Sequence, residues 1–319
     1  MIVDVHAHCR PASVTRALEQ RGGPRRAAAW QLATDSPADL EGRLALMDEA
    51  AVQMQVLTPV GVEPYFEDVV FAADMARRAN DALAELVRRY PSHFAFFATL
   101  PLPHLDASLR EAARALETLG ARGVMVSCSV FDRSTVDPEF EPLYQELNRR
   151  HSVVFYHPIQ NGICSPLVND YKFTVSAGAS MEDSVTVLHL IARQVPVRFP
   201  DLRFIVPHFG GLIPMLLQRL DGQVPPQYPD LNEPPSQTAR RLYYDTVGWG
   251  SDAALLAAWK AFGADHLVTG SDYPVLLHAQ AYPETFACLE RAGLPAVDVE
   301  RILHHNAADL LGLKEQAIR

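Results

Sequence analysis

The chain has 319 residues, of which 48% are hydrophobic, and its formal net charge is −10. This content supports a large buried core, and the negative charge, without any extended Lys/Arg cluster, argues against a nucleic-acid partner. No stretch of about 20 residues is apolar enough to span a membrane, and the N-terminus lacks the apolar core of a signal peptide. The four cysteines show no C-x-x-C pair or dense framework, so we expect reduced thiols and a cytoplasmic location.

Strand-like and helix-like stretches alternate along the chain. The expected strands are a first one beginning at Ile2, followed by residues 54–59, 94–100, 123–127, 153–157, 204–208, 242–246 and 266–272. The expected helices are residues 36–50, 67–89, 105–119, 138–150, 182–198, 213–221 and 252–262, with two closing helices near 283–292 and 297–313. Strict alternation favours a parallel sheet. Eight repeats over this length predict a somewhat distorted (β/α)₈ TIM-like barrel, formed as a single domain by residues 1–319.

Three segments do not fit this alternation. Residues 10–37 are largely polar, contain Gly22–Gly23–Pro24 and show no clear period, so they are predicted to form an inserted loop or lid at the barrel rim. Residues 161–180 and 223–235 read as further long loops at or near the rim. No G-x-G-x-x-G follows any expected strand, which argues against a dinucleotide-binding fold.

Histidine and aspartate gather at the carboxyl ends of the expected strands, where (β/α)₈ barrels carry out catalysis. His6 and His8 lie two residues apart in the first strand, so their side chains point to the same side. The other polar residues at strand ends are Ser127, His157, His208, Asp245 and Asp272. Three imidazoles and one carboxylate suit Zn²⁺ or another divalent transition metal, and a remaining histidine could move protons.

Four motifs carry a resemblance to a known family. They are D-x-H-x-H at Asp4–His8, H-P at His157, H-F-G-G at His208 and G-S-D-Y-P at Gly270. Together they resemble the amidohydrolase superfamily (amidohydrolase-related family 2), and more closely its amino-carboxymuconate-semialdehyde decarboxylase-like branch. The order of the motifs matches over nearly the whole chain.

The resemblance implies a ligand set and a base. His6, His8, His157 and Asp272 would hold one divalent metal ion, with Zn²⁺ expected, Mn²⁺ the alternative and no organic cofactor. His208 would stay off the metal as the acid/base group. The expected fourth strand offers no Lys or Glu to bridge a second ion, so a single metal is predicted.

The resemblance also points to substrate-binding residues. In the family an arginine at the place of Arg219 can reach a neighbouring subunit's site and bind a carboxylate, which implies a homodimer; the alternative is a surface arginine. Trp249, Tyr273 and Phe173 could line the pocket of an aromatic or dienoic acid, or could be ordinary packing. The phenylalanine-arginine-proline stretch of the decarboxylase that names the family is missing, which argues against a muconate semialdehyde substrate.

The predicted activity is therefore metal-dependent, non-oxidative decarboxylation of an aromatic or unsaturated carboxylic acid, with His208 and Asp272 as proton-transfer groups. The alternative is a metal-dependent hydrolase in which activated hydroxide attacks an amide, a lactone or a carbon–carbon bond. A third interpretation, a catalytically inactive barrel that serves as a binding protein, is disfavoured by the intact ligand set.

Overall fold

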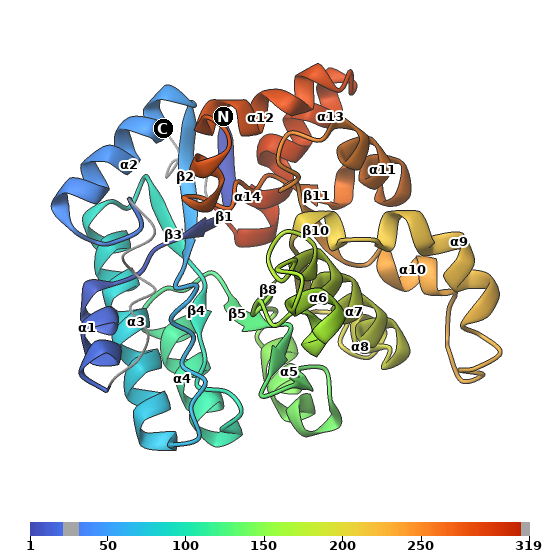
Figure 1. The fold of residues 1–319 in the computed structure, drawn as a ribbon, viewed down its shortest axis with the longest axis horizontal. Helices are drawn as coiled ribbons and strands as arrows, with labels where there is room; N and C mark the ends of the chain where they lie inside the picture. The colour runs from blue at the N-terminus through green and yellow to red at the C-terminus, as the bar shows by residue number, and fades with distance from the viewer. Residues whose placement is uncertain (22–31, 314–319) are drawn as a thin grey trace.

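The computed structural model describes residues 1–21 and 32–313. The strands fall close to their expected positions, in an alternating β/α order (Figure 1). They are β1 (Ile2–His8), β2 (Val52–Thr58), β3 (Phe94–Phe96), β4 (Ala98–Thr99), β5 (Val124–Ser127), β8 (Val153–His157), β9 (Arg203–Val206), β10 (Tyr243–Asp245) and β11 (Leu267–Val268), with a small antiparallel hairpin of β6 (Ser129–Val130) and β7 (Arg133–Ser134). The expected third strand is divided at Phe97 into β3 and β4.

The parallel strands follow one another in space as they do in the sequence. They form a three-stranded sheet, β1-β2-β3, and a six-stranded sheet in the order β11-β10-β9-β8-β5-β4. Backbone hydrogen bonds from Val5 N to Thr269 O (2.8 Å) and from His8 N to Tyr273 O (2.7 Å) join the first strand to the last. The arrangement is that of a distorted (β/α)₈ barrel whose ladders are not continuous around the ring.

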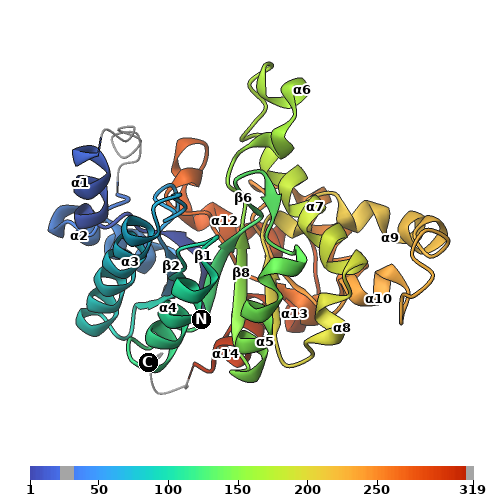
Figure 2. The same ribbon diagram turned by 90° about the horizontal axis from the view of Figure 1, so that it is seen from below.

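Helices cover the outside of the strands (Figures 1 and 2). They are α1 (Ala12–Gln20), α2 (Pro37–Glu49), α3 (Val69–Arg89), α4 (Leu105–Glu117), α5 (Glu141–Arg149), α6 (Pro166–Asn169), α7 (Gly178–Ala192), α8 (Val195–Arg198), α9 (Ile213–Gln223), α10 (Pro235–Ala239), α11 (Asp252–Phe262), α12 (Tyr282–Arg291), α13 (Ala296–Glu300) and α14 (Asn306–Leu311). The predicted start of α2 is confirmed, because the Ser36 side chain accepts a hydrogen bond from Asp39 N and Pro37 is the first helical residue. None of the helices in the described ranges is long and apolar enough to cross a membrane.

The prediction that residues 10–37 form an inserted loop is wrong for its first part. Ala12–Gln20 forms α1, which packs on α3 through the fully buried Val14 and its neighbours Met75 and Ala79. The helix does carry an apolar period, with Val14, Ala17 and Leu18 on the side that packs on α3, but the period is short and lies in a largely polar segment. Residues 22–31 lie outside the described residues, so the predicted lid remains a prediction.

Two layers of apolar side chains hold the barrel together. The smaller cluster takes residues from successive strands, including Val5, Ala95, Phe155 and Ile205, and is joined by Leu311 of α14. The larger cluster packs the strands against the surrounding helices. Figure 2 shows α14 near the N-terminus and the α6 segment projecting at the opposite end. The carboxyl ends of the strands therefore open toward α6, on the side where functional residues are expected.

Candidate metal centre and cavity

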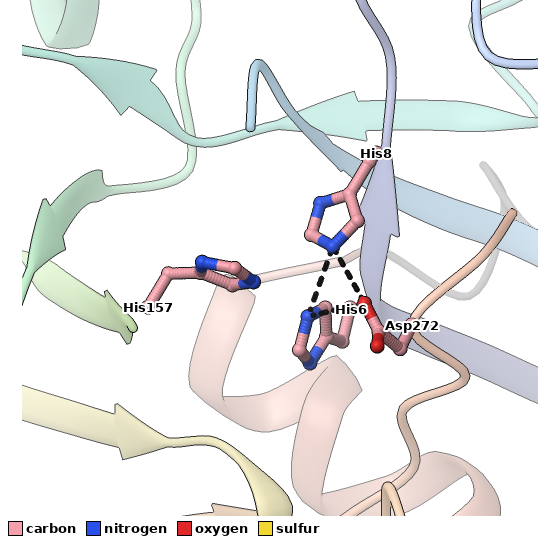
Figure 3. Close-up of side chains that lie close together, drawn as sticks. All are labelled: His6, His8, His157 and Asp272. Carbon is pink, nitrogen blue, oxygen red and sulfur yellow. Dashed lines mark hydrogen bonds and ion pairs between the residues drawn. The ribbon is translucent and has the colours of Figure 1, made fainter. Parts of the chain in front are cut away.

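The four predicted metal ligands meet at the carboxyl end of the barrel. One ligand atom from each of His6, His8, His157 and Asp272 lies within 4.8 Å of the others, and all four residues are buried. Figure 3 shows the three imidazoles and the carboxylate pointing toward one another from β1, β8 and the turn after β11. His8 Nε2 lies 3.2 Å from His6 Nε2 and 2.7 Å from Asp272 Oδ1. The structure thus confirms a metal-binding site built by residues far apart in the sequence.

The register of β1 is irregular in the D-x-H-x-H motif. Its pairing with β2 shifts between Ile2 and Val3 and again between Asp4 and Ala7. As a result Asp4 is not part of the ligand cluster: its carboxylate accepts hydrogen bonds from Ser271 Oγ (2.6 Å) and Tyr282 Oη (2.7 Å). A regular strand would place Asp4 and the histidines on one side, whereas a bulge redirects side chains locally. Asp4 instead ties β1 to the last strand segment.

Each histidine of the cluster is oriented through its other ring nitrogen. His6 Nδ1 lies 2.6 Å from Asp245 Oδ2, His8 Nδ1 lies 2.8 Å from Thr58 Oγ1, and His157 Nδ1 lies 2.8 Å from the Pro158 carbonyl oxygen. With Nδ1 donating to an oxygen, Nε2 carries the lone pair that a metal requires. The donor set therefore fits a divalent transition metal in both composition and tautomer.

Burial and charge favour the ligand protonation states that metals need. Burial lowers the pKa of His8 to about 4 and holds that of His157 well below its usual value. Burial alone would raise the pKa of Asp272, but its contacts with the imidazoles of His6 and His8 outweigh it and keep that pKa well below its usual value. His6 is the exception, because the Asp245 carboxylate overcomes burial and raises its pKa to about 10, so a metal must displace a proton there.

Asp245 forms hydrogen bonds with both His6 and the backbone of His208. Its place at a strand end did not reveal this role. Its Oδ2 holds His6, and its Oδ1 accepts hydrogen bonds from the backbone N–H of His208 (2.8 Å) and of Val247 (3.0 Å). We expect Asp245→Asn to weaken metal affinity about 10- to 100-fold, as is typical for a lost carboxylate partner of a ligating histidine. Competition with a fluorescent chelator measures the change. The exposed Asp230→Asn serves as the matched control, and equal metal affinity in both variants would contradict the bracing role.

His208 stands beside the metal ligands without being one of them. Its ring lies 5.6 Å from that of His6, centroid to centroid, and its Nδ1 is 2.8 Å from Asp183 Oδ2 on α7. Burial alone would lower the pKa of His208, but the Asp183 carboxylate outweighs it and raises that pKa above its usual value. Asp183 was missed by sequence reasoning, since one aspartate in a helix far from any strand end carries no distinguishing signal.

The second glycine of the H-F-G-G motif, Gly211, allows this contact with α7. His208 and Phe209 have positive φ values of 52° and 57°, so the chain turns sharply after β9. A Cβ atom on Gly211 would lie 2.0 Å from the Ser180 carbonyl oxygen of α7. Glycine therefore lets the His208 turn approach the helix that carries Asp183.

One cavity of about 760 Å³ opens onto this centre, and its lining includes His8, His157, His208 and Asp272. Of the predicted substrate-binding residues, Trp249 lines the cavity and is 46% exposed. Tyr273 is fully buried with the Arg43 guanidinium 4.4 Å from its ring centre, and does not line the cavity. Phe173 is exposed beside Lys172, a lining residue, and Arg219 is exposed on α9; neither lines the cavity of its own chain.

Comparison with known proteins agrees with this geometry. The amidohydrolase family profile matches residues 3–313. A decarboxylase of Aspergillus niger, yanB, is 32% identical over 292 residues, which cover 85% of this chain and 77% of that protein. The 6-methylsalicylic acid decarboxylase of Penicillium expansum is 29% identical over 290 residues, which cover 86% of each chain.

A solved structure shares the fold. The dihydroxybenzoic acid decarboxylase of Polaromonas sp. JS666, crystallised with bound manganese and the inhibitor 2-nitroresorcinol, superposes with a TM-score of 0.85 at 22% identity. The match covers 99% of this chain and 98% of that one. The profile match over residues 3–313 and the named relatives show that the chain belongs to the amidohydrolase family, in the branch whose named members are decarboxylases.

Proposed function

We propose that this protein is a metal-dependent, non-oxidative decarboxylase of an aromatic carboxylic acid. The observation that carries the proposal is the position of His208: it is held by Asp183 and lines the same cavity as His8, His157 and Asp272. A proton-transfer group next to a cation site, both facing one cavity, is what exchange of a carboxylate for a proton requires. The decarboxylases among its relatives support the same reaction class.

The reaction needs one proton and no oxidant. A proton adds to the ring carbon that bears the carboxylate, the bond from that carbon to the carboxylate then breaks, and its electron pair returns to the ring as CO₂ leaves. A bound divalent cation would supply positive charge to orient the carboxylate and an adjacent oxygen and to stabilise developing negative charge. We propose that His208 holds the proton before the reaction, that His208 and Asp272 transfer it, and that Asp183 keeps His208 oriented and protonated.

Asp183→Asn tests the link between Asp183 and His208. We expect kcat to fall about 10- to 100-fold with metal content unchanged, because the lost carboxylate both orients the ring and favours its protonated form. Asp183 raises the pKa of His208, so its removal should lower that pKa and move the alkaline limb of the kcat–pH profile to lower pH. Asp230→Asn is the isosteric control. An unshifted alkaline limb would contradict the proposed pairing.

The hydrolase alternative uses the same residues with water as the attacking group. The two reactions are separated by incubating the metal-loaded protein with hydroxybenzoates, methylsalicylates and muconate-type acids and measuring product masses. Release of CO₂ with a product lighter by that mass supports the decarboxylase. A product heavier by one water, or two fragments with water added, would transfer the assignment to the hydrolase.

We propose Zn²⁺ as the resident metal, with Mn²⁺ as the alternative, because three imidazoles and one carboxylate suit both ions. The manganese in the Polaromonas enzyme supports the alternative. Elemental analysis of protein purified without added metal, followed by reloading of the stripped protein with each ion, distinguishes them.

We also propose that the protein is a homodimer in which Arg219 contacts the partner's substrate. Its exposure on α9, away from the cavity lining of its own chain, is compatible with this role. Light scattering tests the assembly, and a monomer with full activity would exclude the role for Arg219.

A further inference from the structure

We propose that the substrate carries an apolar substituent, such as a linear alkyl chain, and that this substituent lies between α9 and α11. The inference rests on the proposed decarboxylase function and specifies the substrate class for the same cavity. It follows from the size of the cavity, from the distribution of polar and apolar side chains along it, and from a set of alanines on α11.

The cavity is larger than a one-ring acid requires. Cavities of about 300–1,000 Å³ enclose ligands of drug size, and this one has about 760 Å³. A benzoate held at the metal centre would occupy only the inner part. The remaining space needs either water or a further part of the ligand, and its lining decides between them.

Apolar residues line the cavity at several places, but near α9 and α11 the lining is apolar throughout. The metal centre and the turns near it contribute the groups that can bind a carboxylate and a hydroxyl: His8, His157, Gln160, His208 and Asp272. The start of α9, the segment before α11 and α11 itself contribute apolar side chains: Pro214, Met215, Val247, Trp249, Ala253, Ala254 and Ala257. Because α9 packs against α11 (Figure 1), we treat these apolar residues as one region of the lining, called the apolar arm below.

The α11 alanines create the space in that arm. Ala253, Ala254 and Ala257 lie on one face of the helix, at i, i+1 and i+4, and all three line the cavity. An alanine presents only a Cβ atom, so these three residues leave more space in the lining than larger side chains would. Water in such an arm would find few hydrogen-bond partners, whereas an alkyl chain would be transferred from water to an apolar surface.

The arm is not built for a second anion. Among the described residues that line the cavity, Lys172 is the only lysine or arginine, and it lies in the turn after α6. Neither α9 nor α11 contributes a charged group to the lining. An apolar substituent is therefore favoured over a second carboxylate, whose desolvation there would have no compensating partner.

The experiment measures kcat/KM for 2-hydroxybenzoates that carry methyl, propyl or pentyl groups at ring position 4, 5 or 6, with the metal-loaded full chain. For at least one ring position we expect kcat/KM to rise about three- to fourfold per methylene, the factor that corresponds to burying one CH₂ group. A series that is flat or falling at every position, with CO₂ still released from the methyl compounds, overturns the inference and leaves the decarboxylase intact. No CO₂ from any acid would instead count against the proposed function.

A substitution in the arm provides the second test. We expect Ala257→Phe to lower the pentyl-to-methyl ratio of kcat/KM at least ~10-fold, since the phenyl ring fills the space that four methylenes would otherwise bury. The smaller change Ala254→Val should lower the same ratio less. It keeps the test possible if the larger side chain of Ala257→Phe impairs folding. Lys260→Phe, which adds the same ring at an exposed position of α11 outside this cavity, is the matched control. An unchanged ratio in both alanine variants would overturn the proposed location.

Discussion

Replacing His208 by alanine is expected to lower kcat by at least ~10² while leaving one metal ion per chain, because general acid–base groups typically contribute ~10²–10⁴ to the rate. His208 lines the cavity, and Asp183 holds its Nδ1 at 2.8 Å. It lies beside the ligand cluster and is not one of its four residues. The variant therefore separates loss of proton transfer from loss of the metal.

Steady-state CO₂ release and elemental analysis on the same preparation measure both quantities. His151→Ala is the matched control, because His151 is an exposed histidine on the turn after α5. Near-normal turnover in His208→Ala would exclude His208 as the proton-transfer group. Loss of turnover together with loss of the metal would make it a structural support of the metal site instead.

Replacing His157 by alanine is expected to abolish stoichiometric metal binding and to lower kcat/KM by at least ~10³. His157 contributes one of three imidazoles to a cluster whose ligand atoms lie within 4.8 Å. Charge stabilisation by a bound cation is worth several kcal/mol, which corresponds to a rate factor of that size. A chelator should reduce the wild-type activity by a similar factor, and added metal should restore it.

A readout independent of activity is the metal-dependent thermal stability. A ligand present at about 100 times its Kd stabilises the folded state by about 2.7 kcal/mol, so metal should raise the Tm of the wild-type chain. The Tm of His157→Ala should not respond, whereas His151→Ala should behave like wild type. An equal rise in Tm for wild type and His157→Ala would contradict the assignment of His157 as a ligand.

Local sequence patterns were sufficient to predict the barrel fold and the polar residues at the carboxyl ends of its strands. Alternating apolar runs and helical periods mark the strands and helices, and the carboxyl ends of parallel strands share one edge. His6, His8, His157 and Asp272 stand at such ends, so their convergence followed from topology without knowledge of any contact. The resemblance of four motifs to the amidohydrolases then separated His208 from the ligands.

Local sequence patterns could not identify the carboxylates that orient the histidines of the site. Asp183 and Asp245 reach His208 across sequence separations of 25 and 37 residues, and any of several acidic residues could have filled those roles. Local patterns also could not show which of the predicted aromatic residues line the cavity. Trp249 lines the cavity, whereas Tyr273 next to Asp272 turns inward and packs on Arg43, because the direction of a side chain in a turn depends on its neighbours in space.

The sequence by itself was enough to predict the (β/α)₈ class from its alternating pattern, and the family and the metal-ligand set from the resemblance of its motifs. Only the tertiary structure decided which carboxylates orient the histidines, that Asp4 ties β1 to the last strand segment instead of joining the cluster, and that α9 and α11 contribute apolar side chains to the cavity lining. These features depend on bulges, on close approach at glycines and on the packing of distant helices. They arise from contacts between residues far apart in the sequence, and hydrophobic periodicity carries no information about such contacts.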